Sequence, residues 1–144
     1  MIRQMQASNI DELVDLALEL WPDHSREEMA GEMAPLLAAA DAAVFGWQEG
    51  DSWEAFAQCQ LRHDYVEGCD TSPVGYLEGI FVREPLRGKG VAKALLERCE
   101  AWAKNQGCRE FASDCELSNV DSLRFHLAAG FQEAGRIICF TKRL

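Results

Sequence analysis

A chain of 144 residues is long enough for one domain with a real hydrophobic core and too short for two, so we expect a single domain over residues 1–144. Because 48% of the residues are apolar, the composition excludes an intrinsically disordered chain. The formal net charge of −10 argues against a nucleic-acid partner, whose phosphates the protein would repel. The same charge suits a cationic small molecule or simple solubility, and charge alone favours solubility.

No apolar run approaches the length that crosses a bilayer, and the N-terminus lacks a signal-peptide pattern. We therefore expect a cytoplasmic protein without a membrane partner. The six cysteines form no CxxC pair, and no neighbouring histidine completes a zinc-binding spacing. Free thiols, several of them in apolar patterns, are expected, and no metal site.

The chain opens with a predicted strand and helix. Residues 1–5 alternate apolar and polar side chains, which favours a strand. Apolar residues then recur at helical spacing over residues 10–20, and either Ser8 or Asn9 can cap this helix. Pro22 ends it.

A second helix and a hairpin are predicted next. Ser25 and Glu28 have the spacing of a capping box, which opens a helix through about Ala39. Residues 42–48 and 54–62 are typical of two strands joined by a turn.

Residues 74–107 predict a strand, a basic loop and a long helix. Residues 74–82 form an apolar strand, and residues 86–90 form the loop after it. Apolar side chains at helical spacing follow over residues 92–102, and Gly107 closes that helix. Residues 109–115 predict a fifth strand.

The C-terminal part predicts a short helix and a last strand. Ser118 or Asn119 caps the helix, which ends near Ala129 before Gly130. Residues 132–144 predict the final strand. The order is then β-α-α-β-β-β-α-β-α-β, a mixed α/β (α+β) domain built around one sheet.

The basic loop has the arrangement that presents backbone N–H groups to an anion: a strand, a glycine-rich turn and a helix start. The sequence contains neither GxxxxGK[ST] nor GxGxxG, which excludes the two common nucleotide-binding fingerprints. Residues 87–92 read RGKGVA, an RxxGxA pattern.

This pattern resembles the pyrophosphate loop of the GNAT acetyltransferase superfamily. A second signature of that superfamily, Asn119 followed by Gly130-Phe131, is present in the correct order. The resemblance implies a GNAT-like fold, acetyl-CoA as the cofactor and coenzyme A as the product. It also implies the cofactor-binding residues, which are strand residues for the pantetheine arm, loop and helix residues for the pyrophosphate, and an asparagine beyond them: Ile80, Phe81, Val82, Arg87, Gly88, Lys89, Gly90, Val91, Ala92, Lys93 and Asn119.

Across essentially its whole length the chain is similar to the aminoglycoside 6'-N-acetyltransferases. The similarity rests on LWP (20–22), RHDYVEGCDTSPVGYLEGIFV (62–82), GCREFASD (107–114) and the terminal GF. It implies acetylation of the 6'-amine of a cationic aminoglycoside, antibiotic resistance and a homodimer. It also implies an acidic residue near position 135 that reaches the drug across the subunit interface; Gly135 lacks that side chain.

A polycationic sugar substrate requires carboxylates and aromatic surfaces. Glu78 lies in an otherwise apolar strand, where a carboxylate is costly unless it meets a cation or solvent, and strict alternation puts Tyr76 and Ile80 on its face. Asp114 follows the fifth strand. The residues that match drug-contacting positions of the resembling family are Trp21, Tyr65, Glu78 and Asp114.

The reaction requires a base, because the amine is mostly protonated near neutral pH. Asp114 or Glu78 can accept the proton, and we favour Asp114 as the base with Glu78 as the positioning group. An N–H near Val82 would stabilise the oxyanion. His126 stands where many superfamily members have a tyrosine; it either protonates the leaving thiolate or only packs on its helix.

Two other functions are compatible with the sequence. One is acetylation of a different amine, such as a polyamine, an amino acid or a protein N-terminus. The other is a non-catalytic acyl-CoA sensor, although a sensor would not need two carboxylates beside the cofactor loop.

Overall fold

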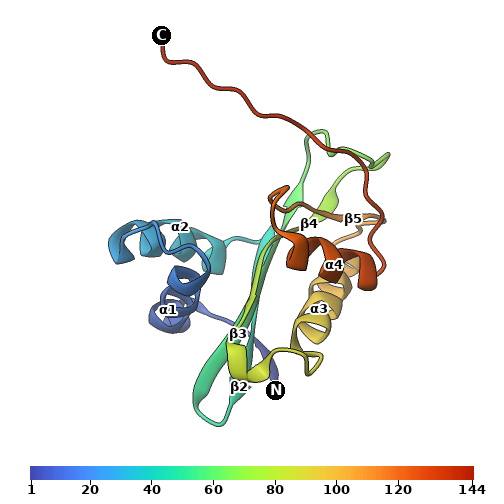
Figure 1. Cartoon of the computed structure of the whole chain (residues 1–144). Helices are drawn as coiled ribbons and strands as arrows, with labels where there is room; N and C mark the ends of the chain where they lie inside the picture. Colours follow the sequence, from blue (N-terminus) through green and yellow to red (C-terminus); the bar gives the residue numbers. More distant parts are fainter.

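The computed structural model describes all 144 residues and contains one five-stranded sheet with helices on both faces. Helices α1 and α2 cover one face, and α3 and α4 cover the other (Figure 1). The elements in chain order are β1 (Ile2–Gln4), α1 (Ile10–Leu20), α2 (Arg26–Ala38), β2 (Ala42–Glu49), β3 (Ser52–Arg62), β4 (Val74–Val82), α3 (Val91–Asn105), β5 (Phe111–Ser113) and α4 (Val120–Ala128), with 3₁₀ turns at Ala7–Asn9 and Glu84–Leu86.

The strands lie in chain order, β1-β2-β3-β4-β5. The first four are antiparallel neighbours, whereas β5 runs parallel to β4. The parallel pairing covers only Gly75–Leu77 of β4. Beyond Leu77 the edge of β4 therefore has no neighbouring strand, and the sheet opens there.

Four predicted helix ends are formed as expected, but α1 has no side-chain cap, because the side chain of its N-cap residue Asn9 accepts from the Gln6 N–H instead. The Ser25 hydroxyl accepts a hydrogen bond from the Glu28 N–H at 3.1 Å, and the Asn119 side chain caps α4. Gly107 and Gly130 follow α3 and α4 with φ angles of 92° and 98°, in the left-handed region that favours glycine.

Each face of the sheet has its own apolar core. Leu13 and Leu16 of α1 pack with Phe56 of β3 on one face. On the other face, Leu95 and Leu96 of α3 pack with alternate residues of β2, β3 and β4. This alternation follows from the period of two residues in a strand.

The alternation in β4 is broken by a bulge. Gln58 of β3 pairs with Gly79, but the next residue of β3 pairs with Leu77, so Glu78 has no partner across the ladder. Glu78 and Gly79 consequently lie on the α1/α2 side, and Ile80 packs into the core on the α3 side. The expectation that strict alternation places Ile80 on the face of Glu78 is wrong, because the bulge shifts the phase of the strand.

The predicted last strand is not formed within the chain. Residues 132–144 have no regular secondary structure, make no backbone–backbone hydrogen bond, and run away from the sheet (Figure 1). Their apolar side chains are left in solvent, with Phe140 90% exposed. The physical reason is that an extended segment becomes a strand only when another strand supplies its hydrogen-bond partners, and no strand of this chain lies beside it.

No helix has the length and apolar character that crossing a bilayer requires. All six cysteines are free, and no cluster of three potential metal ligands is found.

Candidate active site

The loop between β4 and α3 presents a row of free backbone N–H groups. Gly88 and Gly90 have φ angles of 75° and 82°. Six successive N–H groups, from Gly88 to Lys93, find no acceptor in the chain, and the helical ladder starts with the bond from Ala94 to the Gly90 carbonyl at 3.0 Å. These groups lie in the loop and in the first turn of α3, where the helix dipole also favours negative charge. The loop is therefore built to bind an anion such as a pyrophosphate.

The Arg87 side chain holds this loop against β4. Its Nε donates to the Val82 carbonyl at 2.8 Å, and its guanidinium carbon lies 5.8 Å from the centre of the Phe81 ring. Arg87 therefore fixes the position of the loop as well as adding positive charge beside it.

The open edge of β4 leads directly into the loop. The Arg83 N–H donates to the carbonyl of Glu54 in β3 at 3.0 Å, so Arg83 occupies a hydrogen-bonded position opposite β3. Hydrogen-bonded and non-bonded pairs alternate in an antiparallel ladder, which directs the N–H groups of Val82 and Ile80 away from β3 and toward the open edge. An extended ligand could add there like a sixth strand.

Two carboxylates near this opening are linked by an arginine and a tyrosine. Arg62 binds Glu78 with two hydrogen bonds, from Nε to Oε1 at 2.9 Å and from Nη2 to Oε2 at 3.0 Å. The same guanidinium stacks 3.4 Å from the centre of the Tyr76 ring. The Tyr76 hydroxyl in turn donates to Oδ2 of Asp114. Residues from β3, β4 and the end of β5 thus meet at one place.

The surroundings of Tyr76 keep its hydroxyl protonated. Burial, followed by the hydrogen bond to Asp114 and the charge of that carboxylate, raises the pKa of Tyr76 well above its ordinary value of 10.0. The phenol therefore remains a hydrogen-bond donor to Asp114 over the neutral range.

Trp21 and Glu78 line a cavity of about 230 Å³ on the α1/α2 face. The indole of Trp21 lies over Gly79, so close that a Cβ on Gly79 would be 2.5 Å from Cη2. Its ring also meets Phe56 edge-on, with centroids 6.2 Å apart. The absence of a side chain at Gly79 therefore lets the indole pack directly on β4. Two of the predicted substrate residues, Trp21 and Glu78, thus lie at one cavity.

His126 lies on α4 against the end of β5. Its Nδ1 is 2.7 Å from the Ser122 carbonyl oxygen, which can only accept, so Nδ1 carries the hydrogen of the neutral ring. Its Nε2 then accepts from the Ser113 hydroxyl at 2.8 Å. Both ring nitrogens are engaged and the ring packs against Phe131, so structural roles account for His126. The acid role stays a prediction.

Two further predicted residues lie apart from the carboxylates. Tyr65 is 80% exposed, and its hydroxyl donates to Glu67 at 2.9 Å. Asn119 caps α4, where its Oδ1 accepts from the Ser122 N–H at 3.1 Å. The amide NH₂ of Asn119 makes no hydrogen bond within the chain and stays available to a ligand.

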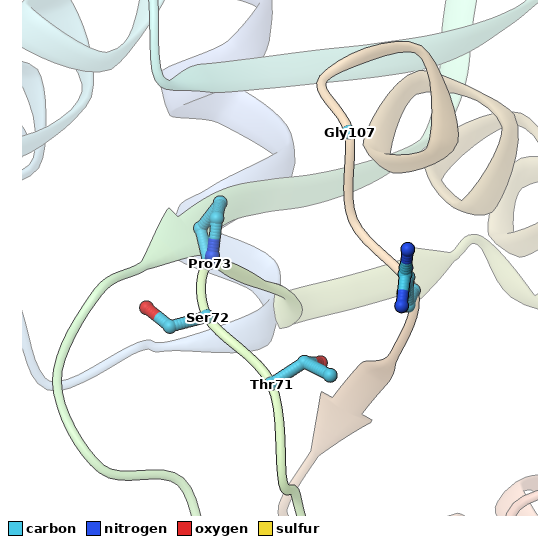
Figure 2. Close-up of a pocket in the computed structure, with 5 residues that line it drawn as sticks. Thr71, Ser72, Pro73 and Gly107 are labelled. Carbon is cyan, nitrogen blue, oxygen red and sulfur yellow. The ribbon is translucent and has the colours of Figure 1, made fainter.

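A second cavity, of about 250 Å³, lies at the opposite end of the β4–β5 pair (Figure 2). Thr71, Ser72 and Pro73 line it before β4, and Gly107 and Arg109 line it before β5. None of the predicted site residues lines it. The cavity lies where β4 begins, whereas the anion-binding loop follows the end of β4. We therefore assign this cavity no part in the site.

Sequence reasoning gives no role to Arg62 or Tyr76, although both lie in the segment that carries the narrower resemblance. A signal was available for Arg62: it ends one strand of a hairpin whose other strand carries Tyr76 and Glu78 on one face. The contact between Tyr76 and Asp114 joins residues 38 positions apart. No local pattern announces such a contact.

Comparison with known proteins agrees with this geometry. The chain matches the profile of the acetyltransferase (GNAT) family over residues 10–131. Aminoglycoside N(6')-acetyltransferase type 1 of Serratia marcescens is 42% identical over 137 residues, with 94% of each chain covered. The protein of the same name from Salmonella typhimurium is 42% identical over 151 residues, covering 99% of this chain and 98% of that one.

Solved structures give the same result. The structure of AAC(6')-Iy in complex with the bisubstrate analogue CoA-S-monomethyl-acetylneamine superposes with a TM-score of 0.95 at 40% identity, covering 100% of this chain and 98% of that one. AAC(6')-Ig from Acinetobacter haemolyticus superposes with a TM-score of 0.94 at 36% identity, covering 100% and 99%. The chain therefore belongs to the acetyltransferase (GNAT) family and, within it, to the aminoglycoside N(6')-acetyltransferases of type 1.

Proposed function

We propose that the protein transfers an acetyl group from acetyl-CoA to the 6'-amine of aminoglycoside antibiotics and so confers resistance. The observation that carries this proposal is the pair of carboxylates, Glu78 and Asp114, beside a sheet edge that leads to six free N–H groups. A polycationic acceptor fits the carboxylates, and an anionic donor fits the amides.

The residues of this chain fit acetyl-CoA, whose reactive thioester supplies the acetyl group. The N–H groups from Gly88 to Lys93 would hold the pyrophosphate, helped by the charges of Arg87 and Lys89. Ile80, Phe81 and Val82 would pair with the pantetheine arm along the open edge of β4. The free amide NH₂ of Asn119 would donate to the same arm beyond the loop.

Asp114 would take the proton that the 6'-ammonium must lose before the nitrogen can attack. Its Oδ2 already accepts from Tyr76, which fixes the carboxylate while Oδ1 stays free for the amine. Glu78 would position the amine, with its negative charge shared with Arg62. Trp21 would supply the apolar face for a sugar ring. Tyr65 would join this set once its loop turns from Glu67 toward the cavity.

The N–H of Val82 would stabilise the negative charge that develops on the acetyl carbonyl oxygen during attack. When the bond to sulfur breaks, the thiolate needs a proton. His126 would supply it, after protonation at Nε2 in place of the bond from Ser113, or water would do so.

We also propose a homodimer in which residues 132–144, here named the C-terminal arm, pair with a second copy of the chain. Ile137 and Ile138 are each 80% exposed and Phe140 is 90% exposed. An apolar, extended segment of this kind is unfavourable in water unless a partner covers it. The arm is also basic: it carries three cations against one carboxylate on a chain of net charge −10, which favours an acidic partner surface (Arg136, Lys142, Arg143; Glu133).

Sedimentation equilibrium tests the dimer. We expect the full-length chain to sediment as a dimer, and a variant with Ile138→Asp and Phe140→Asp to sediment as a monomer. Thr141→Asp, which adds charge to the arm without removing an apolar side chain, is the control. A wild-type chain that stays monomeric at micromolar concentration would refute the proposal.

Residues 1–144 would act as one catalytic domain in the cytoplasm, where acetyl-CoA is available to the enzyme. Six free thiols suit that reducing compartment.

A thiol-release assay with acetyl-CoA tests the proposed reaction. The acceptors are kanamycin-type and gentamicin-type aminoglycosides, a polyamine and a peptide amine, and product mapping identifies the acetylated nitrogen. We expect release with the aminoglycosides and acetylation at the 6' position. Equal turnover of the polyamine or peptide would support the broader amine specificity, and cofactor binding without any release would support the sensor.

A further inference from the structure

Gln58, in the middle of β3, is the one amide among the buried side chains of the chain, and none of those side chains is charged. Its exposed fraction is 7%, and its Oε1 finds no hydrogen-bond partner. Native proteins pair nearly all buried polar atoms, so an unpaired acceptor in the middle of a sheet calls for a ligand or another functional reason.

The unpaired oxygen lies at the predicted acceptor site. Gln58 lines the cavity of about 230 Å³ together with Trp21 and Glu78. It pairs with Gly79 across the ladder, immediately beside the bulge that brings Glu78 onto the same face. The bulge therefore places the amide and the carboxylate next to each other on the cavity floor.

Three side chains around this cavity supply hydrogen-bond acceptor oxygens. Glu32 of α2 and Glu78 of β4 contribute carboxylates, and Gln58 contributes its amide oxygen. The imidazole of His24 lies 3.7 Å from Glu28. A molecule that fills the cavity must therefore bring its own donors, as a sugar with hydroxyl and ammonium groups does.

We propose that Oε1 of Gln58 accepts a hydrogen bond from the sugar ring that carries the reacting 6'-amine. The proposal rests on the proposed function and adds a specificity-determining residue to it. A buried acceptor of this kind discriminates strongly, because an analogue without the matching donor leaves the oxygen unpaired in the complex as well. A neutral amide also accepts the bond without adding further negative charge beside Glu78.

Gln58→Met tests the role, because methionine has a similar length and no hydrogen-bonding oxygen. We expect kcat/KM for a kanamycin-type substrate to fall about ten- to a hundredfold, mainly through KM, while the affinity for acetyl-CoA is unchanged. We also expect the thermal midpoint of the ligand-free protein to rise, because an unpaired buried amide has been removed. A purely structural role for the amide predicts a lower midpoint.

Gln58→Glu should have the opposite effects to Gln58→Met on the thermal midpoint and on substrate binding. It keeps an acceptor but buries a charge, so the ligand-free midpoint should fall while the substrate still raises that midpoint clearly. Gln60→Met is the matched control, since Gln60 lies two residues along on the same face of β3 and does not line the cavity. It should leave KM unchanged.

Two results would overturn the proposal: a Met variant with wild-type KM, or a Glu variant that binds substrate no better than the Met variant. A wild-type protein that releases no thiol with any aminoglycoside would refute the proposed function itself, and this inference with it. The wild-type assay thus separates the two failures.

Discussion

The hydroxyl of Tyr76 donates a hydrogen bond to Asp114, from the middle of β4 to the residue that follows β5. The phenol ring is held in turn by the guanidinium of Arg62, 3.4 Å from its centre. The proposed base is therefore oriented by a residue that belongs to the sheet rather than to a loop, and a rigid support of this kind keeps the carboxylate in one position.

Tyr76→Phe should lower kcat about ten- to a hundredfold, because it removes a hydrogen bond to a charged group and leaves Asp114 free to rotate. The dissociation constant of acetyl-CoA, measured by calorimetry, should not change. Thr71→Val is the control: it also removes a hydroxyl that donates to a carboxylate, Glu110, but at the far end of β4. A Phe variant with wild-type kcat would exclude Tyr76 as a positioning residue.

Asp114→Asn should lower kcat about a hundred- to ten-thousandfold, since an amide cannot accept the proton from the ammonium group. Acetyl-CoA should still bind with native affinity. Steady-state kinetics at pH 7 measure the effect, and Glu116→Gln, an exposed carboxylate in the same loop, is the control. Unchanged turnover would remove Asp114 from the mechanism.

Gly79→Ala should displace Trp21, because the new Cβ would lie 2.5 Å from the indole. We expect a loss of about 1–3 kcal/mol in the free energy of unfolding from the steric conflict. KM for the aminoglycoside should also rise. Gly31→Ala is the control, because a Cβ at Gly31 in α2 has no atom within 4 Å. If the Gly79 variant kept both the wild-type KM and the wild-type stability, the close contact between Trp21 and Gly79 would be contradicted.

Gly90→Val should weaken acetyl-CoA binding, because a β-branched residue is strained at a φ of 82° and would reorient the N–H groups at the start of α3. Gly50→Val places the same side chain at a φ of 60° in the β2–β3 turn. It should cost similar stability and leave cofactor affinity intact. Equal cofactor affinity in both variants would show that the loop has only a structural role.

The raised pKa of Tyr76 predicts a loss of stability at alkaline pH. The folded chain holds this proton more tightly than the unfolded chain does. The resulting contribution to the free energy of unfolding is complete below the pKa of the unfolded chain, about 10, and is lost as the pH rises toward the pKa of the folded chain. Urea unfolding between pH 8 and 11 measures this loss in a Tyr65→Phe background, where Tyr76 is the one remaining tyrosine. Adding Tyr76→Phe should make the decline shallower; identical slopes would contradict the assigned environment.

Much of this fold follows from local patterns in the sequence. Strand β4 is predicted with its observed ends, because its apolar run is bounded by Pro73 on one side and by Glu84-Pro85 on the other. The helix caps at Ser25 and Asn119 are equally local. The RGKGVA pattern of residues 87–92 likewise identifies the open amides.

What the sequence does not predict depends on interactions between distant residues. The bulge at Glu78 arises from the pairing of two strands, and no spacing within β4 announces it. The last strand was expected because residues 132–144 have a strand-like composition, but composition does not supply a neighbour. Gln58 looks like any polar residue of a strand until its burial is known.

The bulge has a consequence for how such an enzyme can diversify. Since Glu78 has no partner across the backbone ladder, its replacement leaves the register of β3 and β4 intact, and the one cross-strand contact it removes is the side-chain ion pair with Arg62. The position that faces the acceptor is therefore constrained by its ion pair with Arg62 and not by the strand pairing, while the edge that receives the cofactor stays fixed. New acceptor preferences can arise at this one residue without rebuilding the domain.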